Sequence, residues 1–246
     1  MISAETEERL RRLLNEQPSY KPGPDILAQI LSKDVSCFVG ASCMGKTTIM
    51  EKLLELDPTY GEFIVFTSRE PRAEDNKTRY SYYEHSDEGL AELLDRIEHK
   101  RVLQYNINPY SLLVYGSEAA GYPYQHNIGD IFASSIDGFR QLGFRTVRVV
   151  SVITDFHDWQ QRFNLRFPPG DPRRNARLLE ASSSLRWSLA QTDSPDHYWL
   201  INNHTPDDVA QDLLNRLALP PAPDPRAVAM AQDCLRGIEE LASHER

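Results

Sequence analysis

The stretch "VSCFVGASCMGKTTIMEKLLEL", residues 35 to 56, joins an apolar run to a helical pattern through a glycine-rich turn. Residues 35–40 predict a short buried strand, and residues 46–56 predict a helix. The turn from Gly40 to Thr47 matches the pattern G-x-x-x-x-G-K-[S/T]. Glycines let the backbone fold around an anion with its N–H groups inward, and the following helix N-terminus adds partial positive charge. The stretch therefore predicts a loop that binds the phosphates of a nucleotide.

The side chains of this loop have separate expected tasks. Lys46 should reach the β- and γ-phosphates of ATP, and Thr47 should ligate Mg²⁺. Cys43 is either a redox-sensing thiol or a small filler residue, and we favour the filler because no neighbour in the sequence would lower its pKa. The residues expected to contact ATP are Gly40, Ala41, Ser42, Cys43, Met44, Gly45, Lys46, Thr47 and Thr48.

An excess of acidic residues limits the classes of partner. The chain has 246 residues, with 27 basic and 36 acidic side chains and a net charge of −9. Binding of nucleic acid without sequence preference requires a cationic surface, so we expect no nucleic-acid partner and a small phosphorylated substrate instead. No apolar run approaches the roughly 20 residues of a membrane span. The charged N-terminus lacks a secretory signal, and the three cysteines form no metal-spaced cluster, so we expect a cytoplasmic protein that does not bind membranes.

Strand and helix patterns alternate along most of the chain, which favours a parallel sheet covered by helices on both faces. The expected strands are 35–40, 62–66, 101–107, 111–116, 127–133, 145–153 and 197–202. The expected helices are 4–16, 46–56, 87–99, 135–142, 157–164 and 172–190, one that opens after Thr205, and one after residue 225. Asp171 is the expected N-cap of the helix 172–190, and Thr205 begins a capping box.

A second stretch, "FTSREPRAEDNKTRYSYY", residues 66 to 83, is typical of an anion site. Arg69 and Arg72 lie on either side of Pro71, which fixes the backbone between them. Two guanidinium groups so placed can bind a terminal phosphate through paired hydrogen bonds. Tyr80 can donate to the same phosphate or cover a ring. The stretch predicts the site of the phosphate acceptor.

With these residues the chain resembles guanylate kinases, which carry a loop of the form T-T-R-x-P-R-x-G-E followed by a tyrosine. The matching residues here are Thr67, Ser68, Arg69, Pro71, Arg72, Glu74 and Tyr80. The resemblance extends over about residues 34 to 217. It implies nucleobase contacts from Tyr115, Ser117 and Asp130, a lid with the arginines Arg166 and Arg177, and an adenine-side Asn202. Lys46, Arg166 and Arg177 are then the expected catalytic residues, which stabilise the charge of the moving phosphoryl group.

The resemblance also implies the fold and its parts. The fold would be a P-loop NTPase fold with a small mixed subdomain that binds a nucleoside monophosphate (NMP), and with a lid. The expected parts are an N-terminal helical extension and linker at 1–33, a guanylate kinase-like domain at 34–218, and a linker with a C-terminal helix at 219–246. Within the domain we expect the core at 34–66 and 119–218, the NMP-binding insert at 67–118 and the lid at 165–177. The terminal helices could cap the core or mediate dimerisation, and capping is the simpler expectation.

The base site departs from the pattern of the resemblance. The position of a base-reading glutamate is Gln104, and Val65 and Ile128 replace a serine and an acidic residue. Asp130 alone remains as a charged acceptor, and one lost charge-assisted bond costs about 1.5–3 kcal/mol of discrimination. The leading hypothesis is transfer of phosphate from ATP to GMP or dGMP. The alternatives are a kinase of the same fold for another phosphorylated acceptor, such as a modified nucleotide or a ribose bisphosphate, and a protein-binding module. The oligomeric state is left open.

Overall fold

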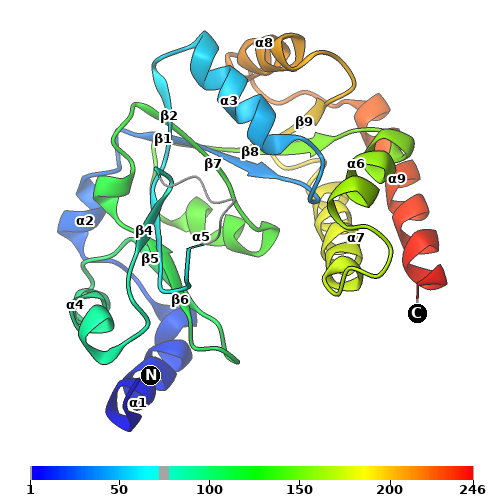
Figure 1. Ribbon diagram of the computed structural model, residues 1–246. Coiled ribbons are helices and arrows are strands. Elements are labelled where there is room, and N and C mark those ends of the chain that lie inside the picture. The colour runs from blue at the N-terminus through cyan, green and yellow to red at the C-terminus, as the bar shows by residue number, and fades with distance from the viewer. Residues whose placement is uncertain (1, 72–77, 246) are drawn as a thin grey trace. The chain divides into compact units, whose positions relative to one another are not determined.

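The structure is a computed structural model that describes residues 2–71 and 78–245 (Figure 1). The α-helices are α1 (Ala4–Glu16), α2 (Pro24–Ala28), α3 (Lys46–Leu56), α4 (Asp87–Glu98), α5 (Ile136–Gln141), α6 (Phe156–Arg166), α7 (Arg174–Ala190), α8 (Pro206–Leu217) and α9 (Pro225–His244). The strands are β1 (Asp34–Val39), β2 (Tyr60–Glu62), β3 (Val65–Thr67), β4 (Tyr80–Tyr82), β5 (Gln104–Ile107), β6 (Val114–Ser117), β7 (His126–Asp130), β8 (Thr146–Ile153) and β9 (His197–Ile201). Short 3₁₀ turns are η1 (Gln17–Ser19), η2 (Ala119–Gly121) and η3 (Ala133–Ser135).

By contacts the chain divides into two compact units. Unit 1 comprises Met1–Asp34, Gly61–Asn127 and Gly138–Arg145, and unit 2 comprises Val35–Tyr60, Ile128–Asp137 and Thr146–Arg246. These limits differ from the domain limits that the resemblance implies, because the N-terminal helix and the predicted insert share one unit. The predicted domain limits therefore stay predictions. No helix in the described part of the chain is both long enough and apolar enough to cross a membrane.

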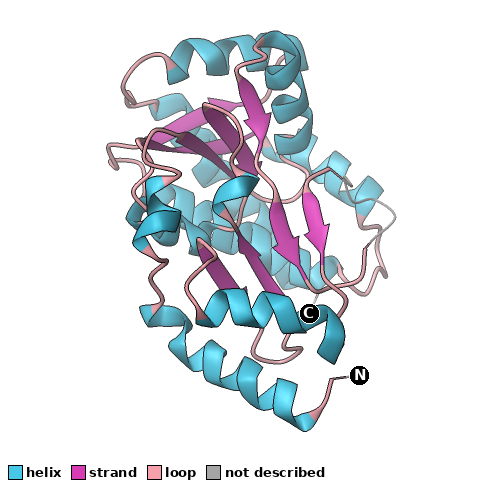
Figure 2. Ribbon diagram, turned by 90° about the vertical axis from the view of Figure 1, so that its left-hand side faces the viewer, coloured by secondary structure: helices cyan, strands magenta, loops and turns pink. Residues whose placement is uncertain are grey.

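Most of a parallel sheet covered on both faces lies in unit 2, although the ends of β2 and β7 belong to unit 1. The five described strands have the order β2-β7-β1-β8-β9, and β8 pairs with β9 in parallel. In Figure 1, α3 and α8 lie on one face of β8 and β9, and α6, α7 and α9 lie on the other. All six residues of β1 are buried, as expected of a strand between two helical layers. The architecture of helices on strands is also visible in Figure 2, and the predicted fold class is confirmed.

Unit 1 carries a separate mixed sheet of four strands in the order β4-β3-β6-β5. β3 pairs with β4 in parallel, whereas β6 runs antiparallel to both β3 and β5. The inner face of this sheet packs on α4 and α1, with Leu10 and Leu13 of α1 fully buried. The Tyr105 hydroxyl donates to the Leu13 carbonyl at 2.8 Å. The N-terminal helix therefore closes the core of unit 1, as expected of a capping helix.

Two sequence-based expectations about these elements are wrong. The run 62–66 is not one strand: β2 ends at Glu62 and β3 begins at Val65, in different sheets. The break arises because Phe63 is fully buried against Tyr122, with ring centroids 5.0 Å apart, and Ile64 donates its N–H to Gly121.

The second wrong expectation concerns the start of α7. Asp171 is not its N-cap, because its carboxylate accepts the N–H of Arg173 in a turn before the helix. The helix then begins at Arg174, after an N-cap residue, Arg173, whose side chain makes no capping hydrogen bond. By contrast, the predicted cap at Thr205 is confirmed, since its side chain accepts the N–H of Asp208.

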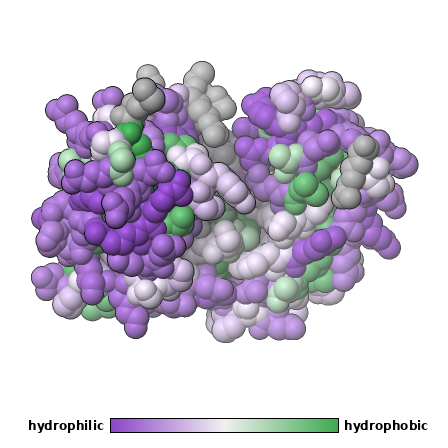
Figure 3. All heavy atoms as spheres, turned by 90° about the horizontal axis from the view of Figure 1, so that it is seen from below, coloured by the Kyte–Doolittle hydropathy of each residue, from purple (hydrophilic) through white to green (hydrophobic). Residues whose placement is uncertain are grey.

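Polar residues cover most of one face of the surface. The face drawn in Figure 3 is mostly hydrophilic, with apolar side chains scattered in small groups.

Inside unit 2, a row of aromatic rings in contact runs along the buried side of α6: Phe156, Trp159, Phe163 and, just after the helix, Phe167. We call this the aromatic row. Its centroid separations of 6.0, 4.7 and 5.3 Å are those of favourable ring pairs.

The aromatic row predicts a large difference between two positions of α6. Phe163→Ala removes a fully buried ring and should lower the free energy of unfolding by about 3–5 kcal/mol. Leu165→Ala, in the same helix but at a side chain that is 86% exposed, should change it by less than about 0.5 kcal/mol. Denaturation in urea measures both. Equal losses at the two positions would contradict the packing described here.

Candidate functional site

The loop between β1 and α3, predicted to bind phosphate, follows a backbone path that favours glycine at two positions. Gly40 and Gly45 have φ values of 144° and 90°, which side-chain-bearing residues rarely adopt. A Cβ atom at Gly40 would lie 2.8 Å from the Val152 carbonyl oxygen. Helix α3 begins directly after Gly45, at Lys46, so the first N–H groups of the helix belong to the loop. Such a helix start attracts anions through its unpaired N–H groups and its dipole.

Lys46 lies over the loop that it would serve. Its side chain is buried, and Nζ donates to the carbonyls of Gly40 at 2.6 Å and Ala41 at 3.0 Å. The Asp130 carboxylate at the end of β7 is 3.8 Å from the same nitrogen. The resemblance assigned Asp130 to a nucleobase, and that role stays a prediction; the structure places its carboxylate beside the lysine of the phosphate loop. Thr47 and Thr48 are exposed at the first turn of α3.

Two side chains hold the loop from behind. The Asn202 amide Nδ2, just after β9, donates to the Met44 carbonyl at 2.8 Å. Trp159 of the aromatic row donates from Nε1 to the Ser42 carbonyl at 2.9 Å. Ala41 and Met44 are fully buried in the core, so their side chains anchor the loop. The predicted adenine contact of Asn202 stays a prediction, because the contact that the structure shows is with the loop itself.

Arginines of α6 lie beside the loop. Burial raises the pKa of the Cys43 thiol, although a hydrogen bond and charge from Arg166 and the charges of Lys46 and Arg162 act to lower it. From the sequence we favour a filler role for Cys43 because no neighbour in the sequence would lower its pKa. In the structure three cations act to lower that pKa, and burial raises it by more than they lower it. Cys43 also has a φ of 71°, an uncommon value for a residue with a side chain.

Sequence reasoning missed Arg162. It precedes Arg166 by one helical turn, so the two share a face of α6, and this spacing was the available signal. Arg162 lies close to the loop: a Cβ at Gly45 would be 3.6 Å from its Nη1. Trp159 was missed as well, because a buried tryptophan in an amphipathic helix reads as an ordinary core residue.

The other arginines around the loop 167–173 are engaged elsewhere. Arg177, a predicted catalytic residue, forms an ion pair with Glu180 on its own helix. Arg173 binds the Asp171 carboxylate at 2.8 Å, and its hydrogen bonds lower the pKa of Asp171 to about 2. Arg174 is almost fully buried and is not available to a ligand. Arg166 is the expected lid arginine that the structure brings to the phosphate loop.

The predicted acceptor residues of unit 1 gather on one face of the mixed sheet. Alternation along strands puts residues two apart on the same face. With the observed register, one row across the sheet is Tyr80, Val65, Ser117 and Gln104, and the next is Tyr82, Thr67, Tyr115 and Asn106. The predicted residues Tyr80, Gln104, Tyr115 and Ser117 therefore share a face, as a common site requires.

Arg69 is tied to this face by stacking. Its guanidinium lies 5.0 Å from the centroid of the Tyr80 ring and 5.8 Å from that of Tyr82. The same guanidinium donates from Nη1 to the Glu70 carbonyl at 2.9 Å. Tyr82 was not expected from the sequence. Arg72, the second predicted arginine, lies outside the described residues, as does Glu74.

The base-reading part of the face is less accessible. Ser117 is fully buried, and its hydroxyl accepts a hydrogen bond from the Tyr122 phenol at 3.0 Å. Gln104 is half-buried, with Oε1 close to Gly138, where a Cβ would be 3.3 Å away. Ile128, in place of an acidic residue, belongs to the apolar core of unit 2.

One group of possible metal ligands occurs among the described residues, Asp155, His157 and Asp158. The Asp155 carboxylate already accepts the Asp158 N–H at 2.9 Å as the cap of α6, and accepts from the Asn203 amide at 3.0 Å. A structural role for this carboxylate in starting α6 accounts for its position.

Comparisons with known proteins add the backbone similarity only. No protein-family model matches the sequence. No curated protein matches it either. Among solved structures, a guanylate kinase from Anaplasma phagocytophilum is similar, with 14% identity over 76% of this chain and 84% of that chain, and a TM-score of 0.49. A similarity of this size carries no argument about site residues, so the assignments that follow rest on the geometry described above.

The environment of Cys43 predicts slow alkylation that depends on pH. Because burial raises the pKa of the thiol, its thiolate fraction at neutral pH is below that of an ordinary cysteine. Iodoacetamide should therefore modify Cys43 more slowly than it modifies glutathione at pH 7.5, and the rate should keep rising above pH 9. Mass spectrometry of the peptide that contains Cys43 measures this, with Cys43→Ser as the control for Cys37 and Cys234, which are buried. A rate already maximal at pH 7 would refute the expected protonation state.

Proposed function

We propose that the protein is an ATP-dependent kinase that transfers phosphate to a nucleoside monophosphate, with GMP or dGMP as the leading acceptors. The observation that carries the proposal is the phosphate loop from Gly40 to Thr47, with Lys46 over its carbonyls and Arg166 beside its thiol. A polyphosphate would bind here because backbone amides, a helix N-terminus and several cations converge on one loop.

The donor site fits ATP with Mg²⁺. The two positive-φ glycines shape a cradle that a Cβ would fill, and Lys46 can exchange its carbonyl partners for phosphate oxygens. The exposed Thr47 hydroxyl and the Asp130 carboxylate supply oxygens, the ligands that Mg²⁺ prefers. When bound, Mg²⁺ neutralises charge on the phosphates that are to be transferred.

The catalytic task of the protein is positioning and charge stabilisation. The acceptor is already a phosphate anion, so no general base is needed. Lys46 and Arg166 stabilise the charge that spreads over the oxygens of the transferring group, and Arg177 joins them if it leaves Glu180. Arg162 adds a further cation next to Gly45. Guanidinium groups at this point also exclude water, which would otherwise compete as the acceptor.

The proposed site of the acceptor phosphate lies on unit 1. It consists of Arg69, which is stacked on Tyr80, of Tyr80 itself, and of Arg72, three residues after Arg69 in the sequence. The face made by Gln104 and Tyr115 is proposed to bind the base. A glutamine can accept one hydrogen bond and donate another, so it does not demand the two donors of guanine.

A second candidate acceptor is suggested by the reduced set of groups that could recognise guanine. The buried Ser117, the apolar Ile128 and the position of Asp130 beside Lys46 reduce the set that would read guanine. A kinase of the same architecture for a modified nucleotide or a ribose bisphosphate accommodates these residues equally well. A protein-binding module is disfavoured, because such a module needs neither the buried lysine nor the glycine cradle.

Turnover measurements with several acceptors test the proposal. With ATP and Mg²⁺, release of ADP should depend on one member of a panel of GMP, dGMP, AMP, CMP, UMP and a ribose bisphosphate. Lys46→Ala should lower turnover by at least about 100-fold, and EDTA should abolish it. Lys52→Ala, at a lysine of the same helix that pairs with Glu55, is the matched control and should leave turnover unchanged. Silence with every acceptor, in a protein that still binds ATP, would reject the proposed panel of substrates.

The assignment of Arg69 has its own test. Arg69→Ala should raise the KM for the acceptor by about 10- to 150-fold, the value of one or two charge-assisted hydrogen bonds. The KM for ATP should stay within about 2-fold, because Arg69 belongs to the acceptor face. Arg11→Ala, at an exposed ion pair of α1, serves as the control. An equal rise of both KM values would show that Arg69 does not act on the acceptor.

A further inference from the structure

The C-terminal helix α9 contacts both helices that flank the loop 167–173. Its buried residues Ala227, Ala231, Cys234 and Ile238 belong to the core of unit 2. Against α6 it approaches closely at Gly237, where a Cβ would lie 2.5 Å from the Phe156 ring. Against α7 it forms the most extensive helix–helix contact of the unit. The position of the loop 167–173 therefore depends on elements that α9 holds.

One ion pair joins α9 to the first residue of α7. Arg174 is 4% exposed, and its Nε donates to the Glu245 carboxylate at 2.6 and 2.8 Å. The same guanidinium donates from Nη1 to the Phe167 carbonyl and lies 4.9 Å from the centroid of the Phe163 ring. A single side chain thus connects the end of α9, the start of α7 and the first residue of the loop. Such a buried cation depends on its carboxylate partner.

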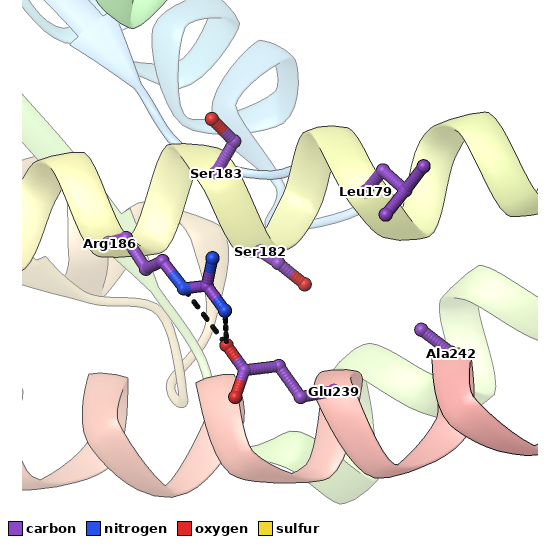
Figure 4. A pocket seen from close by; sticks show the side chains of 6 residues that line it. All are labelled: Leu179, Ser182, Ser183, Arg186, Glu239 and Ala242. Atoms are coloured by element: carbon purple, nitrogen blue, oxygen red, sulfur yellow. Dashed lines mark hydrogen bonds and ion pairs between the residues drawn. The ribbon is translucent and has the colours of Figure 1, made fainter.

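A second pair lies farther along the same two helices. Arg186 of α7 donates to Glu239 of α9 at 2.6 and 3.0 Å, as Figure 4 shows. The side chains are 66% and 39% exposed, against 5% and 23% for Arg174 and Glu245. Arg186 and Glu239 line a surface pocket of about 250 Å³, together with the other residues labelled in Figure 4. We call the contact between α7 and α9 the seam. Of the two ion pairs across it, the pair of Arg174 with Glu245 is the one next to the loop 167–173.

The ion pair of Arg174 with Glu245 is connected, through Phe167, to residues of the proposed donor site. Phe167, whose carbonyl accepts from Arg174, has the guanidinium groups of Arg166 and Arg173 over its ring at 5.6 and 5.3 Å. Arg166 in turn lies beside Cys43 of the phosphate loop. A shift of Phe167 would therefore move the arginine that the proposed function places at the transferring phosphate.

We propose that Glu245 is a positioning residue: through Arg174 and Phe167 it fixes the loop 167–173 and sets Arg166 against the phosphate loop. Its effect on turnover rests on the proposed function, whereas its effect on the order of the loop does not. The C-terminal helix is then a brace for the arginines of the donor site in addition to a cover for the core.

Hydrogen exchange of backbone amides tests the brace without reference to activity. Glu245→Gln keeps the shape of the side chain and removes the charge that holds Arg174. Amides of residues 165–177 should exchange at least about 10-fold faster in this variant, and amides of β8 and β9 should not change. Glu239→Gln, at the exposed pair of the same seam, is the matched control and should leave residues 165–177 unchanged. Unchanged exchange in Glu245→Gln would overturn the proposal.

Kinetics give the second readout. If the brace acts on Arg166, Glu245→Gln should lower kcat by about 10-fold and leave the KM for the acceptor unchanged, and Glu239→Gln should do neither. A chain that ends at Ser243 lacks Glu245 altogether and should reproduce both the faster exchange and the lower kcat, which guards against an effect peculiar to glutamine. A lower kcat without faster exchange would refute the brace. If no acceptor is turned over, the proposed function fails and the exchange result still decides the role of Glu245.

Discussion

The backbone of the loop between Gly40 and Gly45 constrains the rest of unit 2. A binding site made of amide groups works only if those groups point inward, and this path requires left-handed φ values at several positions. The loop cannot hold that path alone. It is fixed by the Asn202 amide from β9, by the Trp159 indole from α6 and by the close Val152 carbonyl of β8. The sheet and helices of unit 2 thus serve to preorganise a few backbone amides.

The same support reaches the cations around the loop. The aromatic row continues from Trp159 through Phe163 to Phe167. The Arg174 guanidinium lies over the Phe163 ring, and those of Arg166 and Arg173 lie over the Phe167 ring. Electrostatic stabilisation of a transferring phosphate is effective only if the charges are in place before the reaction, since reorganisation would consume the benefit. Rigid rings and a buried guanidinium are suited to that requirement. Helix α9, which packs against this row, lies beyond residue 217, where the predicted resemblance to guanylate kinases ends.

Local patterns in the sequence predicted the elements well where the decisive contacts are local. Helix α3 has the predicted limits, because its glycine start and apolar spacing lie within the helix itself. The break at Phe63 could not be predicted, since it depends on Tyr122 and Gly121 far along the chain. The start of α7 was misjudged because an aspartate before a proline can cap a turn as readily as a helix.

The candidate site divides in the same way. The loop residues were predicted from spacing alone, and their roles stay predictions. The strand register places Tyr80, Gln104, Tyr115 and Ser117 on one face, which is compatible with a common site. The burial of Ser117 under Tyr122 and the approach of Asp130 to Lys46 are tertiary facts that no local pattern contains. Likewise, the ion pair of Arg174 with Glu245 joins residues 71 positions apart.

The hydrogen bond from Trp159 to the Ser42 carbonyl has an optical consequence. The indole is fully buried among aromatic rings, and its one polar group is attached to the backbone that would contact a nucleotide. The emission of an indole responds to the polarity and hydrogen bonding of its surroundings. The chain therefore carries an intrinsic fluorophore at the back of the loop between β1 and α3. In a chain whose other two tryptophans, Trp187 and Trp199, are replaced, a ligand bound at this loop should change the emission.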